Sequence, residues 1–203
     1  MSQYFIDNIR VFSGQDLLKL YMYAEKPVSK NEMMAFASLG LRYNEGQELL
    51  NHPEYLDVNT RVVHFKSNKK WDRELLYKDR NIYLSYWDLI NVHDYILSNR
   101  SHIVNPKYNN LTKNMNNWAK HAGIWSKGIG VHGLRVTRFV WLLKTFPDSI
   151  DKIIESMDYN PTKYHKLNMN DKKIEEYINI PFTQHELDLI KSLLCGWSGN
   201  TTT

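Results

Sequence analysis

A histidine and an arginine three residues apart, His132 and Arg135, open an apolar run that ends at Leu143. If this run is helical, the two side chains lie on one face of the helix, about 5–6 Å apart. A guanidinium group offers two parallel hydrogen bonds and a permanent charge, so a guanidinium beside an imidazole suits a phosphate. By itself, such a pair is more often part of an ordinary buried helix. A functional interpretation therefore needs further residues that converge on the same target.

A second arginine, Arg42, stands where an apolar segment ends at Gly40 and a new helix is expected to begin. Burial of an unpaired charge in such apolar surroundings costs much free energy. Arg42 therefore needs a partner, and the sequence offers either Glu45, three residues later, or an external anion.

Lysines cluster between segments that are typical of strands. Residues 58–66 are β-branched and roughly alternating, and residues 71–76 and 81–85 resemble returning strands, so we expect a small antiparallel hairpin. The tip of this hairpin would carry three lysines, Lys66, Lys69 and Lys70. They are placed either to reach a phosphate backbone or simply to form a solvated turn.

Apolar periodicity predicts helices in most of the remaining chain. The expected helices cover residues 15–23, 31–40, 45–50, 86–97, 112–122, 131–143, 150–157, 172–180 and 184–194. The residues before the first helix are interpreted as an irregular lead-in. The sequence therefore predicts an α+β fold that is mainly α-helical with a small antiparallel β-sheet.

The composition of the 203 residues indicates one globular domain, since 42% are hydrophobic. The single cysteine, Cys195, excludes a disulfide framework and a thiolate metal cluster. The net charge of +4 is compatible with a polyanionic partner. The first residues carry no secretory leader pattern and no run of 18 apolar residues occurs, so we expect a cytoplasmic protein without a membrane partner.

The order of these features resembles the catalytic domain of the tyrosine recombinases, the family of the phage integrases. Residues 39–45, LGLRYNE, are similar to the family's first box, TGLRxxE, and residues 132–137, HGLRVT, to its second box, HxLRxT. Lys66 corresponds to the family's hairpin lysine. The resemblance covers about residues 12–195 and implies the recombinase catalytic-domain fold.

The resemblance implies site-specific DNA recombination or integration without metal or cofactor. A tyrosine hydroxyl would attack a DNA phosphorus, leaving a 3′-phosphotyrosyl link and a free 5′-hydroxyl. His132 would serve as the base and Lys66 would protonate the leaving oxygen, while Arg42 and Arg135 would stabilise the transition-state charge. Four further residues would contact the DNA backbone: Lys69, Lys70, Lys127 and Arg138.

Two positions depart from the family pattern. The third-box position, usually His or Trp, is Asp158, whose carboxylate would repel a phosphate. The family spacing puts the nucleophile at Leu167, so Tyr177 and Tyr164 both remain candidates. Tyr177 is preferred because it lies on an expected helix that is followed by one final helix. These departures leave open an inactive recombinase-fold protein that only binds DNA, as a phage-type repressor or accessory factor.

The expected organisation is a single recombinase-like domain over residues 1–203, without the family's separate N-terminal DNA-clamping domain. The expected partners are double-stranded DNA and further copies of the chain, as a tetramer by family resemblance. The DNA target sequence does not follow from the sequence, and neither does the choice between integration, excision and resolution.

Overall fold

The structure is a computed structural model that describes residues 3–65, 80–99, 110–157 and 171–195. Five residues assigned roles above lie outside the described residues: Lys66, Lys69, Lys70, Asp158 and Tyr164. The strand expected over residues 71–76 lies outside them too.

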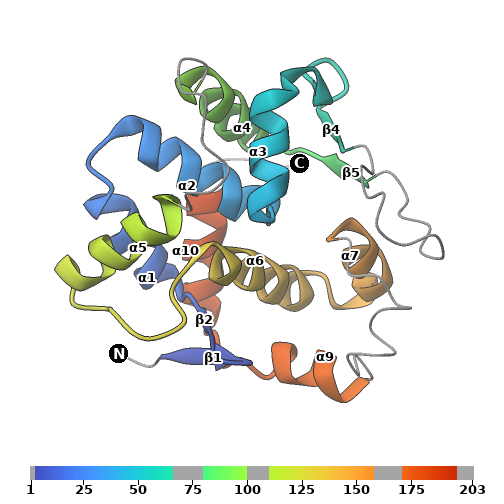
Figure 1. Cartoon of the computed structure of the whole chain (residues 1–203). Coiled ribbons are helices and arrows are strands. Elements are labelled where there is room, and N and C mark those ends of the chain that lie inside the picture. Colours follow the sequence, from blue (N-terminus) through green and yellow to red (C-terminus); the bar gives the residue numbers. More distant parts are fainter. Residues whose placement is uncertain (1–2, 66–79, 100–109, 158–170, 196–203) are drawn as a thin grey trace, which may run out of the picture.

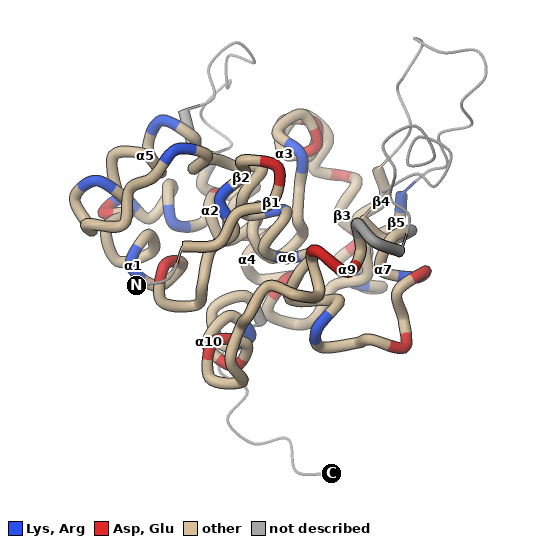
Figure 2. Tube along the Cα trace, turned by 90° about the horizontal axis from the view of Figure 1, so that it is seen from below, with Lys and Arg blue, Asp and Glu red and all other residues tan. Residues whose placement is uncertain are grey.

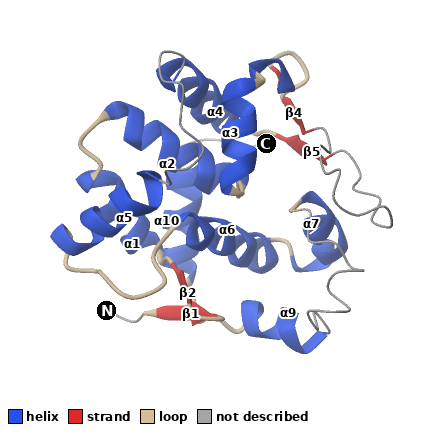
Figure 3. Cartoon of the chain, in the orientation of Figure 1, coloured by secondary structure: helices blue, strands red, loops and turns tan. Residues whose placement is uncertain are grey.

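Helices make up most of the described chain (Figure 3). The α-helices are α1 (Gly14–Tyr23), α2 (Pro27–Leu39), α3 (Tyr43–Asn51), α4 (Tyr86–Asn99), α5 (Asn110–His121), α6 (Val131–Thr145), α7 (Ile150–Ser156), α9 (Asp171–Ile178) and α10 (Gln184–Cys195). Short 3-10 helices are η1 (Pro53–Tyr55) and η2 (Pro147–Ser149). The prediction of a mainly helical fold is confirmed. One boundary differs clearly, because α2 begins at Pro27 rather than near Asn31; a proline fits the first turn of a helix.

The described strands form two small antiparallel sheets. One sheet pairs β1 (Tyr4–Ile6) with β2 (Ile9–Val11), and the other has the order β3 (Leu56–Asp57), β4 (Val62–Phe65), β5 (Arg80–Tyr83). The predicted antiparallel pairing is therefore present between β4 and β5, with Phe65 opposite Arg80.

Two details of the strands differ from the sequence prediction. The expected lead-in contains the hairpin β1–β2, whose turn residues Asp7 and Asn8 both have positive φ, as short hairpin turns require. The strand expected from residue 58 begins only at Val62. The reason is local, because the Asp57 carboxylate accepts hydrogen bonds from the backbone N–H groups of Asn59 (2.9 Å) and Thr60 (3.1 Å), which forms a turn.

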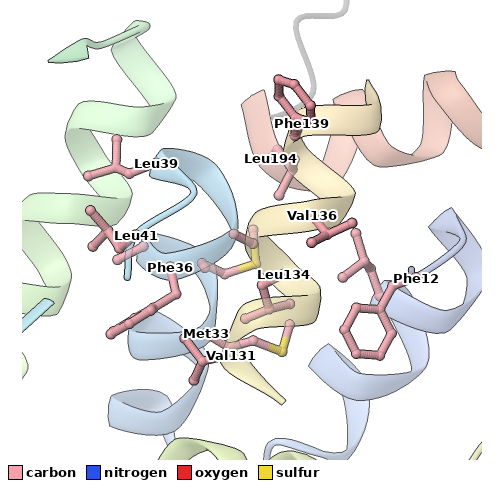
Figure 4. Packing of buried hydrophobic residues seen from close by; sticks show 14 of the residues in the cluster. Phe12, Met33, Phe36, Leu39, Leu41, Val131, Leu134, Val136, Phe139 and Leu194 are labelled. Carbon is pink, nitrogen blue, oxygen red and sulfur yellow. The ribbon is translucent and has the colours of Figure 1, made fainter. Parts of the chain in front are cut away.

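Helix α6 lies in the middle of the molecule, with α2 above it and α7 and α9 near its C-terminal end (Figure 1). It is buried nearly all round, as expected for a helix that is apolar on most faces. Figure 4 shows its side chains Val131 and Leu134 packed with Met33 and Phe36 of α2. The backbone N–H of Phe12, just after β2, donates to the Thr137 hydroxyl of α6 (2.8 Å). The position of α6 is therefore fixed from several sides.

The turn between α2 and α3 depends on Gly40, which ends α2 in the left-handed conformation (φ 59°). A Cβ at this position would lie only 2.6 Å from the Met157 side chain, so the turn also needs the absence of a side chain. The chain then enters α3 with Arg42 as its N-cap residue.

The last described helix, α10, packs against α1, α2 and α4. Its Glu186 carboxylate accepts a hydrogen bond from the backbone N–H of Gly14 (2.5 Å). A residue that is distant in the sequence thus helps to cap the N-terminus of α1. Of the helices within the described ranges, none is long and apolar enough to span a membrane.

Candidate functional site

Three arginines converge on one carboxylate, that of Glu45 in the first turn of α3. The Glu45 Oε1 atom lies 2.9 Å from Arg42 Nη1 and 2.8 Å from Arg80 Nη1, and its Oε2 atom lies 3.8 Å from Arg135 Nη1. The three arginines come from the α2–α3 turn, from β5 and from α6. The local pair that the sequence offered, Arg42 with Glu45, is confirmed, and two distant arginines join it.

The charges around Glu45 determine its protonation state. Burial by itself raises the pKa of this carboxyl group, but the guanidinium groups of Arg80, Arg135 and Arg42 outweigh burial. The backbone N–H of Arg42 donates to Oε2 (2.7 Å) and also favours the ionised form. The net result is a pKa below the usual 4.5. Glu45 is therefore an anion at neutral pH and holds the three arginines together.

Arg135 is the most deeply buried member of this cluster, with 1% of its side chain exposed. Its Nη1 group donates to the Gly40 carbonyl (2.5 Å), and its Nη2 group donates to the Met157 carbonyl. Through these bonds Arg135 ties α6 to the end of α2 and to the residue that follows α7. Arg135 lies below the protein surface, and its positive charge lowers the pKa of Glu45 and of His132.

Arg80 is a member of the cluster that sequence reasoning missed. It is 7% exposed, and its Nε group donates to the Ser156 carbonyl (2.7 Å) in addition to its bond with Glu45. Through these two bonds Arg80 connects β5 to α3 and to the last residue of α7. No motif marks Arg80 in the sequence, because all of its described partners are distant in the chain.

A pocket of about 400 Å³ opens beside this cluster at the N-terminal end of α6. It is lined by Ile9, Leu41, Arg42, Tyr43, Thr112 and residues 128–133. The Arg42 side chain is 39% exposed, so its charge is accessible there. The positive end of the α6 dipole faces the pocket. The N-cap residue Gly130 has no side chain that could cap the first N–H groups of the helix. These features together favour an anion in the pocket.

The wall of the pocket is held by hydrogen bonds to backbone groups. The Thr112 hydroxyl of α5 accepts from the N–H of Val131 (3.3 Å), and the N–H of Arg10 in β2 donates to the Gly128 carbonyl (3.1 Å). The loop that leads into α6 is thus anchored on two sides. Thr112 is another pocket residue that the sequence did not single out.

His132 lies on the exposed side of the first turn of α6 and lines the same pocket. Partial burial of its ring, together with the positive charges of Arg135 and Arg42, lowers its pKa below the usual 6.5. The imidazole is therefore neutral at pH 7, and one ring nitrogen is able to accept a proton. The structure thus brings together His132, Arg42 and, behind them, Arg135.

Tyr177, the preferred nucleophile, is not among the residues that line the pocket. It is 6% exposed and packs edge to face on Phe139 of α6, with ring centroids 5.0 Å apart. Phe139 lies seven residues after His132, which is about 10 Å along the helix axis. Tyr177 therefore packs on a part of α6 that is closer to the C-terminal end of the helix than the pocket is.

The two described residues expected to contact DNA differ in exposure. Lys127 is exposed on the loop before α6, next to Gly128 of the pocket wall. Arg138 is only partly exposed, and its guanidinium carbon lies 4.7 Å from the centroid of the Trp141 ring. Lys127 is thus accessible beside the pocket, whereas Arg138 is packed against the helix surface.

Comparisons of the chain with protein-family models, with curated proteins and with solved structures gave no match. An accessible guanidinium, a neutral imidazole and a helix N-terminus around one pocket form a suitable set of partners for a phosphate group.

Proposed function

We propose that this protein is a DNA strand-cleaving and rejoining enzyme of the tyrosine recombinase type, acting on double-stranded DNA. The observation that supports the proposal most is that Arg42 and His132 line one pocket, with Arg135 directly behind them. These are the residues of the two motifs on which the resemblance rests. A mainly helical fold with a small antiparallel sheet is compatible with the recombinase catalytic domain.

In the proposed reaction a DNA phosphate occupies the pocket. A tyrosine oxygen attacks phosphorus while neutral His132 takes the phenol proton. The bond from phosphorus to the 5′ oxygen breaks, and Lys66 supplies the proton that this oxygen needs. Arg42 and the α6 N-terminus stabilise the charge that grows on the non-bridging oxygens, and the buried Arg135 adds to the positive potential. Attack by a 5′-hydroxyl on the phosphotyrosyl bond then rejoins the strand.

The use of Tyr177 as the nucleophile would require a change in its surroundings. Attack by Tyr177 requires the phenol to leave its contact with Phe139, because the ring is buried there. We therefore expect cleavage by Tyr177 to be slow unless DNA binding or contact with another copy of the chain displaces α9. Tyr164 lies outside the described residues.

The test is a suicide substrate that carries the protein's own attachment sequence and loses a short strand after cleavage. We expect wild type to form a covalent protein–DNA adduct that resists denaturing gel electrophoresis. The adduct should disappear in one of the variants Tyr177→Phe and Tyr164→Phe and persist in the other. Persistence in both variants would assign the nucleophile to a residue other than Tyr177 and Tyr164. Tight binding without any adduct from wild type would overturn the enzymatic proposal.

The pH dependence of the same assay tests the role of His132. Because its pKa lies below 6.5, the adduct rate should rise with pH below that value and level off above it. In His132→Gln the rate should fall about 100-fold or more, since general base catalysis contributes about 10²–10⁴-fold, while DNA affinity is retained. A wild-type rate that keeps rising tenfold per pH unit above pH 7 would assign the titration to another group.

A second function is favoured by two observations. Tyr177 is buried, and protein carbonyls accept hydrogen bonds from Arg135, as expected for a protein that binds DNA without cutting it. Such a protein would serve as a repressor or accessory factor. Specific binding that survives both tyrosine substitutions, with no adduct from wild type, would establish this second function in place of the first.

A further inference from the structure

The surface beside the pocket is basic, and the chain segment that forms it contains no acidic residue. Residues 110–147 contain no Asp or Glu. Three lysines of this segment are exposed, Lys113 and Lys120 on α5 and Lys127 in the loop that follows. Figure 2 shows the distribution of basic residues in blue, with blue segments along α5. The charge of this surface complements a nucleic-acid backbone.

An aromatic ring stands among these lysines. Trp125 is 49% exposed, and the Lys120 ammonium nitrogen lies 5.9 Å from its ring centroid. Its indole N–H donates to the Asn116 side-chain oxygen (3.0 Å), which fixes the ring against α5. Because the polar atom of the indole is already bonded within the protein, what Trp125 offers to a partner is its apolar ring surface.

Asn116 connects Trp125 to the pocket. Its side-chain amide nitrogen donates to the carbonyl of Thr112 (2.9 Å) and to the carbonyl of Ile129 (3.1 Å). Both of these residues line the pocket. The ring of Trp125 is thus separated from the pocket wall by one hydrogen-bonded side chain, and one ligand is able to touch both.

We infer that Trp125 is a stacking platform for an unpaired base of a DNA strand whose backbone runs along Lys113, Lys120 and Lys127. A fixed aromatic ring among lysines binds a single strand by stacking and by charge. In a duplex the bases already stack on one another, so the ring surface is of use only for an unpaired nucleotide. The choice of DNA as the partner rests on the proposed function; the stacking itself does not require cleavage.

The experiment compares the affinity of wild type and Trp125→Ala for a fluorescently labelled 12-nucleotide thymidine strand at low salt. Loss of one stacked base should weaken binding about 5- to 100-fold, and Trp125→Phe should restore most of it. Trp87→Ala is the matched control, because Trp87 is also exposed, at 39%, but lies on α4. It should leave the affinity unchanged. Binding of a duplex of the same length should be nearly equal for wild type and Trp125→Ala.

The outcomes separate this inference from the proposed function. Equal single-strand affinity of wild type and Trp125→Ala would overturn it, and so would an equal loss for single strand and duplex. An equal loss in Trp87→Ala would also overturn it. If wild type forms no covalent adduct but the single-strand loss is specific to Trp125, the recombinase proposal fails and the stacking platform stands.

Discussion

The substitution Glu45→Gln tests the arginine cluster that positions the pocket. The change removes the negative charge that lies between Arg80 and Arg135, whose side chains are 6% and 1% exposed. Removal of one partner from a buried ion pair costs about 3–5 kcal/mol. The glutamine oxygen still accepts a hydrogen bond, so we expect the lower end, about 3 kcal/mol. Arg42 adds little, because its side chain is 39% exposed.

Urea unfolding at pH 7 measures this cost. With a slope of about 2 kcal/mol per molar urea, a loss of about 3 kcal/mol lowers the midpoint by about 1.5 M. The matched control is Glu54→Gln, which breaks a pair with His52 in which the Glu54 side chain is 67% exposed. The control should change stability by less than about 1 kcal/mol. Equal midpoints for the two variants would refute the role of Glu45 as the centre of the cluster.

The pH dependence gives an independent check of the same reasoning. The folded-state pKa of Glu45 is below its ordinary value of 4.5, so its ionisation stabilises the folded protein above that pH. This contribution is lost as the pH falls through the folded-state pKa. The difference in unfolding free energy between wild type and Glu45→Gln should therefore shrink below pH 4.5. A constant difference between pH 7 and pH 3 would contradict this explanation.

Three further predictions concern stability. Burial raises the pKa of Glu32 from 4.5 to about 7, so the stability of wild type should fall as the pH rises from 4.5 to 7. Glu32→Gln should remove this fall and gain up to about 3 kcal/mol at pH 8. Equal changes in stability for both proteins between pH 5 and pH 8, measured by urea unfolding, would contradict this prediction. Gly46→Ala would bring a Cβ to 2.2 Å from the Phe36 ring, so overpacking should cost about 1–3 kcal/mol; an unchanged melting temperature by circular dichroism would contradict this. Tyr177→Ala should cost about 3–5 kcal/mol in urea unfolding because its ring packs on Phe139, and a loss below 1 kcal/mol would show that the contact contributes little.

The sequence predicted those parts of the structure that depend on local patterns. The helices follow from apolar periodicity, and the pair of Arg42 and Glu45 follows from their separation of three residues. The hairpin β1–β2 was missed because strands of three residues are too short to show an alternating pattern. The turn at residues 58–61 was missed because hydrogen bonds from two backbone N–H groups to the Asp57 carboxylate overrode the β-branched composition.

The site was predictable only in part for a similar reason. Periodicity places His132 and Arg135 near one another on a helix, but it does not show that one is exposed and the other is buried. That difference depends on what packs against α6. Arg80 and Thr112 reach the site from distant parts of the chain, so no spacing rule identifies them.

We propose that the pocket at the start of α6 binds a DNA phosphate. This proposal is tested most directly by measuring duplex DNA affinity against salt concentration for wild type, Arg42→Ala and Lys191→Ala. Lys191 is exposed on α10 and does not line the pocket, so it controls for the loss of one positive charge. We predict that Arg42→Ala weakens binding and lowers the slope of log K against log salt by about one, while Lys191→Ala changes neither. Identical salt dependence for wild type and Arg42→Ala would contradict the claim.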